Sequence, residues 1–203
     1  MKDRIILDLC GGTGAWSRPY AEAGYDVRLV TLPDQDVRLY VQPKNVYGIL
    51  AAPPCTEFSF VLNKKIMRNF KNGMETVNAC LKIIQICNPQ WWALENPIGH
   101  LITFLGKPKF SFQPFEFGDP WTKRTGIWGA FNNPVKTFSS WDAVTKNPKL
   151  YIRPGRSKPN MAFLHKSAQA NIPSLKQYSV RSDSDFRAIT PSGFARAFFE
   201  ANP

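Results

Sequence analysis

Two side chains of this sequence, Cys55 and Glu95, have types and positions that suit catalysis. Cys55 follows the apolar run 46–52, which is expected to be a buried strand that two prolines bring to an end. Glu95 follows the apolar run 91–94, which is expected to be another buried strand. Ligands bind at the carboxyl ends of strands in open α/β sheets, so both side chains are predicted to lie at one site. A thiolate can attack carbon and a carboxyl group can exchange a proton, so the pair suits covalent catalysis.

Each of these side chains also has an ordinary structural interpretation. A lone cysteine is more often a small buried apolar residue than a nucleophile, and a carboxylate that precedes a loop is usually solvated. The two prolines before Cys55 and the polar loop after it favour the catalytic interpretation.

The first 32 residues have the pattern of a βαβ unit. Residues 4–9 are expected to be a strand, residues 18–23 a helix that Gly24 ends, and residues 25–32 a second strand. The stretch 10–17 between strand and helix is rich in glycine, which permits a tight turn and the close approach of a ligand. A βαβ unit implies a parallel sheet, and a glycine turn at this place usually serves a nucleotide-like cofactor. Neither the G-x-G-x-x-G fingerprint nor a P-loop lysine is present.

Two further helices are expected in the rest of the chain. Apolar residues at helical spacing predict a helix over 73–87 that Asn88 and Pro89 end. A terminal helix is predicted over 194–201, with Thr190 or Ser192 as its N-cap and Pro191 in its first turn. The stretch 58–72 is rich in lysine and arginine, and it is interpreted either as a basic loop beside the site or as a solvated loop.

The positive charge lies mostly in the last 83 residues. Residues 121–203 carry 13 basic and 4 acidic side chains, whereas residues 1–120 carry 13 basic and 11 acidic side chains, and the net charge of the chain is +11. Such asymmetry points to nucleic acid as a partner, although a basic surface also serves solubility. The stretch 130–186 is rich in proline and serine, which predicts irregular loops rather than a second core.

Length and composition favour one globular domain, residues 1–203, that is expected to be a cytoplasmic monomer. No run approaches the ~18 apolar residues of a membrane span, and no signal-peptide core follows the first residues. The four cysteines form no C-x-x-C pair and there are only two histidines, so neither structural disulfides nor a metal site is expected.

Four motifs, in the same order along the chain, resemble those of the cytosine-C5 DNA methyltransferases. DLCGGTGAWS resembles D-L-F-x-G-x-G-G-F-S, and AAPPCTEFS resembles G-G-P-P-C-Q-x-F-S, which carries the catalytic cysteine of that family. ALENP resembles the E-N-V motif. FGDPWTKRTGIWG resembles Y-G-x-P-Q-x-R-x-R-x-x-x-x-G, which places Lys123 on the first arginine and Thr125 on the second.

The resemblance implies a Rossmann-like class I methyltransferase fold, an α/β fold with a mostly parallel sheet and helices on both faces. It also implies S-adenosylmethionine as cofactor and methylation of cytosine C5 in DNA through a covalent adduct on a flipped base. Cys55 then attacks C6, Glu95 shares a proton with N3, and Lys123 or Arg124 steadies the O2 edge. The implied cofactor contacts are Asp8, Gly11, Gly12, Gly14, Trp16, Thr31, Asp36 and Pro53. The implied DNA contacts are Ser59, Lys64, Lys65 and Arg68.

The sequence departs from the family pattern in ways that leave alternatives open. Thr31 stands where the family has an acidic residue for the ribose, and Trp16 has a core alternative. The stretch 130–186 is a reduced recognition insert, so short or lax sequence selectivity is expected. C5 methylation of RNA or of a free cytidine nucleotide, and DNA binding without catalysis, are the alternative functions. The compact size suggests a bacterial or phage-infected host cell.

Overall fold

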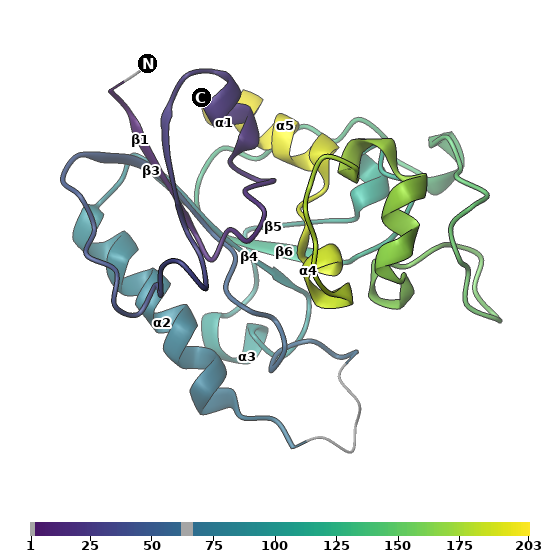
Figure 1. Ribbon diagram of the computed structural model, residues 1–203, viewed down its shortest axis with the longest axis horizontal. Coiled ribbons are helices and arrows are strands. Elements are labelled where there is room, and N and C mark those ends of the chain that lie inside the picture. The colour runs from purple at the N-terminus through teal and green to yellow at the C-terminus, as the bar shows by residue number, and fades with distance from the viewer. Residues whose placement is uncertain (1–2, 62–66) are drawn as a thin grey trace.

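The described residues of the computed structural model, 3–61 and 67–203, form one mixed sheet with helices on both faces (Figure 1). Lys64 and Lys65 therefore lie outside the described residues. The strands are β1 (Ile5–Leu9), β2 (Asp26–Val30), β3 (Val46–Ala51), β4 (Trp91–Pro97), β5 (Phe110–Phe112) and β6 (Thr125–Ala130). The α-helices are α1 (Arg18–Glu22), α2 (Phe70–Cys87), α3 (Ile102–Leu105), α4 (Asp183–Ala188) and α5 (Ser192–Ala201). The 3-10 helices are η1 (Pro114–Phe117), η2 (Trp141–Ala143), η3 (Met161–Phe163), η4 (Lys166–Asn171) and η5 (Pro173–Leu175).

The sheet has the strand order β2-β1-β3-β4-β6-β5, and its first four strands are parallel. β6 runs antiparallel to β4, and β5 runs antiparallel to β6. Buried parallel strands read as continuous apolar runs, and the runs at β1, β3 and β4 have this form. The predicted α/β fold with a mostly parallel sheet and helices on both faces is confirmed.

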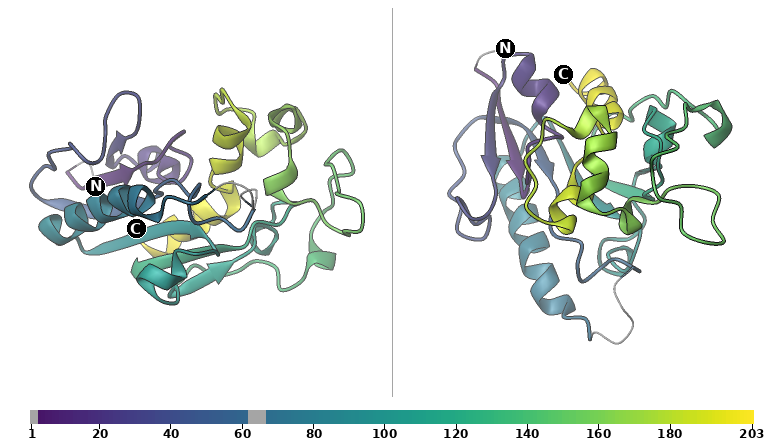
Figure 2. Two further views of the ribbon diagram at one scale, coloured as in Figure 1. Left: turned by 90° about the horizontal axis from the view of Figure 1, so that it is seen from below. Right: turned by 45° about the vertical axis from the view of Figure 1, so that its right-hand side comes forward.

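Alternate residues of the central strands point to opposite faces of the sheet. Leu7 and Leu9 of β1 pack in one buried cluster with α2 residues such as Val77. Ile6 points to the opposite face and packs in a second cluster with Tyr20 of α1 and with α5 residues. Figure 2 shows the same arrangement, with α2 on one side of the sheet and α5 on the other.

The helix boundaries depend on caps that lie outside the predicted ranges. α2 begins three residues before the predicted start because the Asn69 side chain accepts a hydrogen bond from the Asn72 N–H (3.0 Å). The predicted caps of α5 are wrong: the N-cap residue is Pro191, and no side chain of that residue type can accept a bond. The first turn of α5 closes through its backbone, where the Ala195 N–H donates to the Pro191 carbonyl (2.9 Å).

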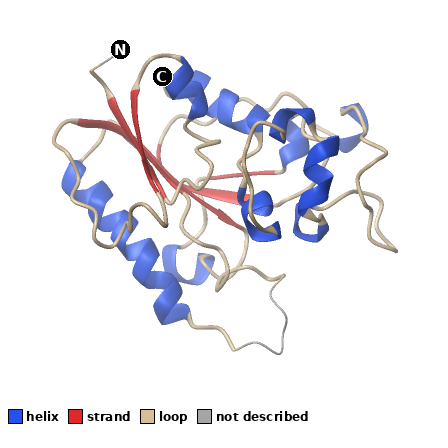
Figure 3. Ribbon diagram, viewed as in Figure 1, coloured by secondary structure: helices blue, strands red, loops and turns tan. Residues whose placement is uncertain are grey.

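The stretch 130–186, called the basic segment below, is mostly loop with short helical turns (Figure 3). Apolar residues of the segment share a third buried cluster with residues from outside it, which the sequence did not predict. The cluster is formed by Ala15, Trp121, Leu150, Met161, Leu164, Ile172, Leu175, Phe186 and Ile189. These apolar residues follow neither a helical nor a strand period, because the backbone between them is irregular. Periodicity therefore gave no signal for this cluster.

None of the helices formed by residues 3–61 and 67–203 combines the length and the apolar content that crossing a membrane requires.

Gly129 is the glycine whose replacement tests the pairing of β4 with β6. Its φ of 144° is unfavourable for other residues, and an added Cβ would lie 2.1 Å from the Trp92 carbonyl oxygen. We expect Gly129→Ala to lower the free energy of unfolding by about 3 kcal/mol, measured by urea denaturation. Gly155→Ala is the control, because φ is 76° there but no atom lies within 4 Å of the added Cβ. We expect a loss of about 1 kcal/mol from this control; equal losses would contradict the steric argument.

Candidate active site

The candidate site lies where the strand order of the parallel part of the sheet reverses. β1 has β2 on one side and β3 on the other, so the chain passes from β1 to β2 in one direction and then from β2 back past β1 to β3. Such a point opens a crevice at the carboxyl ends of the strands. The glycine loop 10–17 follows β1 here, and the Pro-Pro-Cys sequence 53–55 follows β3. Both predicted loops therefore leave the sheet at the same edge.

Cys55, Glu95 and Lys123 converge at this edge. The Lys123 Nζ lies 3.6 Å from the Glu95 Oε1, and each side chain is only 15% exposed. Burial raises the pKa of the Cys55 thiol above its ordinary value; the nearby Lys123 ammonium lowers it and the Glu95 carboxylate raises it again. The nucleophile candidate therefore lies within the electrostatic reach of both partners.

The structure distinguishes between the two basic residues that the sequence left open. Lys123 faces Glu95, whereas Arg124 is exposed and contributes its carbonyl oxygen to the Ile98 N–H (2.9 Å). The Lys123 backbone N–H donates to the Gln113 Oε1 (3.0 Å), and the buried Thr125 donates its hydroxyl to the Lys123 carbonyl (2.9 Å). These bonds hold the backbone of Lys123 at the site.

The loop that carries Cys55 is fixed by neighbours from β4 and from the following turn. The Asn96 Nδ2 donates to the Pro53 carbonyl (2.9 Å), and Asn96 is fully buried. The Phe58 and Ser59 N–H groups donate to the Cys55 carbonyl at 3.0 and 2.9 Å. Sequence reasoning assigned Glu95 of the Glu-Asn pair and missed Asn96. The signal that could have identified Asn96 was its residue type, because an asparagine amide can donate to a backbone carbonyl such as that of Pro53.

Arg68, a predicted DNA contact, holds the same loop from its far end. Its guanidinium donates to the Glu57 and Ser59 carbonyls, each at 2.8 Å. The Ser59 hydroxyl accepts from the Val61 N–H at 3.2 Å. Two donors of Arg68 are therefore engaged within the protein, and its predicted contact with DNA stays a prediction.

On the cofactor side, Asp8 is fully buried next to the glycine turn. Its Oδ2 accepts the Ser17 hydroxyl at 2.5 Å, and its Oδ1 has no partner among the described residues. Burial raises the pKa of Asp8 to about 6, and the bonds from Ser17 oppose this shift. A side chain at Gly11 would overlap the carboxyl, because an added Cβ would lie 2.3 Å from the Asp8 Cγ. Asp8 and the glycine turn are thus packed as one unit.

The turn fits the cofactor that the motifs imply. Gly12 has a φ of 55° and no atom within 4 Å of an added Cβ, so the backbone there faces open space. Gly14, with a φ of 70°, completes the turn. S-adenosylmethionine carries an ammonium group, a sulfonium and a carboxylate. An open turn beside a carboxyl oxygen that lacks a partner suits such a zwitterion.

Three other predicted cofactor residues differ in their surroundings. Thr31 is half-buried directly after β2. Asp36 forms a 2.5 Å ion pair with Arg38, whose hydrogen bonds lower the pKa of Asp36 to about 2. Trp16 is 2% exposed, with ring centroids 5.8 Å from Phe194 and 5.4 Å from Phe198. The core alternative therefore holds for Trp16, because a ring enclosed in this way offers almost no surface to a ligand.

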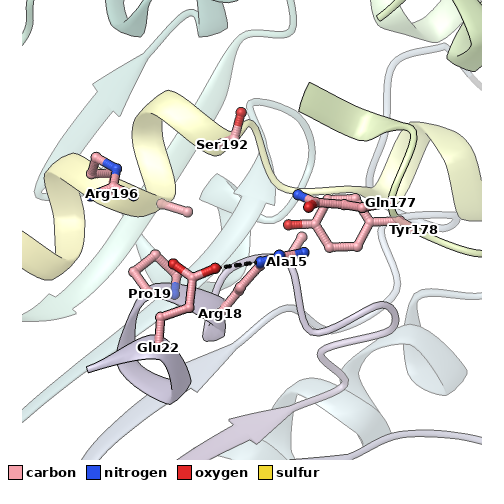
Figure 4. A pocket seen from close by; sticks show the side chains of 9 residues that line it. Ala15, Arg18, Pro19, Glu22, Gln177, Tyr178, Ser192 and Arg196 are labelled. Atoms are coloured by element: carbon pink, nitrogen blue, oxygen red, sulfur yellow. Dashed lines mark hydrogen bonds and ion pairs between the residues drawn. The ribbon is translucent and has the colours of Figure 1, made fainter. Parts of the chain in front are cut away.

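A separate hollow of 140 Å³ lies between α1, α5 and the turn at Gln177 and Tyr178 (Figure 4). Arg18 and Glu22 form a 2.7 Å ion pair at its wall. None of the candidate catalytic residues lines it. Within the part of the chain that the structure describes, no group of three or more His, Cys, Asp or Glu side chains is placed to hold a metal ion.

The pH dependence of stability tests the burial of Asp8. Its pKa is about 6 in the folded protein against an ordinary 3.8, so its carboxyl favours folding fully below pH 3.8, and this contribution is lost as the pH rises through 6. Asparagine cannot ionise. We therefore expect the free energy of unfolding of the wild type to fall, between pH 4 and pH 8, by about 3 kcal/mol more than that of Asp8→Asn.

Asp119→Asn is the matched comparison for this experiment. Burial raises the pKa of Asp119 to about 7, so its contribution is lost at higher pH than that of Asp8. Curves for Asp8→Asn and wild type that run parallel from pH 4 to pH 8 would contradict the assignment for Asp8.

Alkylation of Cys55 by iodoacetamide tests the electrostatics of the three converging residues. Only the thiolate reacts, and the Lys123 ammonium favours it whereas the Glu95 carboxylate opposes it. We expect Lys123→Met to slow modification of the Cys55 peptide at pH 8 about tenfold and Glu95→Gln to accelerate it, measured by mass spectrometry. Arg124→Met is the control, because Arg124 is exposed. If Arg124→Met slowed alkylation as much as Lys123→Met, the choice of Lys123 would be wrong.

No family model matches the chain, and no curated protein matches it. Among the solved structures that are similar to it are the following two. One is an E. coli protein described as a DNA modification methyltransferase encoded within a prophage (17% identity, 78% of this chain and 51% of that chain covered, TM-score 0.47). The other is a mutant of Spodoptera frugiperda DNMT2 (19% identity, 77% of this chain and 57% of that chain covered, TM-score 0.41). The chain thus spans little more than half the length of the solved structures that it matches.

Proposed function

We propose that this protein methylates C5 of cytosine in DNA through a covalent adduct between Cys55 and the base. The observation that carries the proposal is the convergence of Cys55, Glu95 and Lys123 at the sheet edge that also carries the glycine turn. The three side chains come from three separate stretches of the chain. Each has a function in activating a pyrimidine ring.

Cys55 supplies the nucleophile. Cytosine C5 is a weak nucleophile, so the thiolate first attacks C6, and the ring electrons that this bond displaces make C5 electron-rich. Negative charge develops towards N3 and O2. Glu95 donates a proton at N3, and the Lys123 ammonium stabilises charge at O2.

Formation of the bond between the methyl carbon and C5 leads to release of the methylated base from Cys55. S-adenosylmethionine, when bound, supplies the methyl group to the electron-rich C5. A base then removes the C5 proton, the C6–S bond breaks, and Cys55 leaves as the thiolate. No described side chain is marked as this base, and a water molecule suits the task. The residues that would hold the cofactor are Asp8, Gly11, Gly12, Gly14, Thr31, Asp36 and Pro53.

The basic segment suits the phosphate backbone of DNA. Its exposed basic side chains are Lys136, Lys146, Lys149, Arg153, Arg156, Lys166, Lys176 and Arg181. Aromatic groups lie among them: the Arg153 guanidinium is 4.9 Å from the centre of the Phe163 ring, and Tyr151 is 55% exposed. Positive charges bind phosphates and aromatic rings stack on unpaired bases, so this surface supports binding of DNA with an extruded base.

An adduct with 5-fluorocytosine tests the proposal. Fluorine at C5 cannot be removed as a proton is, so the C6–S bond persists after methyl transfer. We expect wild-type protein with S-adenosylmethionine to form a denaturation-resistant adduct with fluorocytosine duplex DNA, measured by gel electrophoresis. Cys55→Ser should form none, whereas Cys87→Ser, which changes a half-buried cysteine of α2, should behave as wild type.

The outcomes separate the candidate functions. An adduct in Cys55→Ser would show that the nucleophile is another residue. An adduct with fluorocytosine RNA and not with DNA would favour the RNA alternative. DNA binding without any adduct in the wild type would favour a protein that binds DNA but does not catalyse.

A further inference from the structure

Helix α4, which begins within the basic segment, contacts the candidate active site directly through Lys123. The Lys123 Nζ donates a hydrogen bond to the Arg187 carbonyl of α4 at 3.2 Å. Its distance to the Glu95 Oε1 is 3.6 Å, which is an ion pair but too long for a hydrogen bond. Of the contacts that the described residues make with this ammonium, the α4 carbonyl is therefore the one with hydrogen-bond geometry.

The Arg187 carbonyl is free to accept because of its position in α4. α4 ends at Ala188, and the last four carbonyls of a helix have no N–H of the same helix to bond. A lysine ammonium is a suitable partner for such a carbonyl. The end of α4 therefore provides an acceptor that holds the Lys123 side chain beside Glu95.

The position of this carbonyl is set by the third buried cluster. Phe186 is fully buried and Ile189 is 3% exposed, so the two residues on either side of the α4 end are anchored in that cluster. The Arg187 side chain adds two contacts: its Nε donates to the Leu164 carbonyl at 3.0 Å, and its guanidinium pairs with Asp183 at 3.4 Å. Leu164 belongs to the same cluster.

We infer that Arg187 is a positioning residue that, by fixing the end of α4, holds the Lys123 ammonium against Glu95 and Cys55. This inference deepens the proposed function and rests on it for the reaction that is served. It gives the basic segment, whose Leu164 and Asp183 hold Arg187, a second task besides the proposed contact with DNA. If this segment packed incorrectly, Lys123 would lose its hydrogen-bond acceptor. The charged groups around the ammonium are Glu95 and the ionised form of Cys55, and α4 adds the Arg187 guanidinium with its partner Asp183.

A double-mutant cycle on the reactivity of Cys55 tests the inference. We compare wild type, Arg187→Ala, Lys123→Met and the double variant by the rate at which iodoacetamide modifies the Cys55 peptide between pH 7 and pH 10. Arg187→Ala should slow alkylation at pH 8 about threefold and move the profile to higher pH, because the freed ammonium favours the thiolate less. In the Lys123→Met background, Arg187→Ala should have no further effect.

Two further variants keep the outcome interpretable. Arg181→Ala is the matched control: Arg181 is an exposed arginine just before α4, and its backbone rather than its side chain bonds Asp185 and Lys166. It should react as wild type. If Arg187→Ala does not fold, Asp183→Asn replaces it, since this change removes the 3.4 Å pair and leaves the Ser182–Asp185 capping box in place.

A wild-type profile in Arg187→Ala would overturn the inference. An equal slowing in both backgrounds would also overturn it, because a general loosening of the segment does not act through Lys123. Alkylation requires neither DNA nor S-adenosylmethionine, so these results do not depend on methyl transfer. Failure of the proposed function would appear instead as the absence of the fluorocytosine adduct.

Discussion

The contact on which the candidate site depends is the one between the Lys123 ammonium, the Glu95 carboxylate and the Arg187 carbonyl. A charged lysine that is 15% exposed is stable only if nearby oxygen atoms replace the water that it has lost. Here those oxygens belong to β4 and to α4, which lie on different layers of the molecule. The sheet and the basic segment are thus joined at the place where the chemistry is proposed to occur.

The rest of the site is built from backbone that side chains hold in place. Asn96 fixes the loop before Cys55, and Arg68 fixes the loop after it. Gly99 permits a close approach of two backbone segments, since an added Cβ there would lie 2.1 Å from the Phe58 carbonyl oxygen. A nucleophile that is fixed from both sides loses little conformational entropy when a substrate arrives.

The strands and the convergence of Cys55 with Glu95 were predictable because each follows a continuous apolar run of a parallel sheet. The choice between Lys123 and Arg124 could not be predicted from the sequence. The two adjacent residues before β6 face different surroundings, and the packing of α4 determines which of them faces the site. The sequence left the core and cofactor interpretations of Trp16 open for a similar reason: Phe194 and Phe198, which enclose it, come from the far end of the chain. Apolar residues of the third cluster lack any period, so their packing was invisible in the sequence.

The packing of Gly11 against Asp8 limits how the two positions can evolve. Any side chain at position 11 occupies the volume of the carboxyl, and any removal of the carboxyl leaves a polar cavity beside Ser17. A change of either residue alone therefore lowers the stability of the protein. Replacing Gly11 by a small residue and Asp8 by a smaller one at the same time conserves the occupied volume. Among divergent relatives, covariation of these two positions is the signature that this contact would leave.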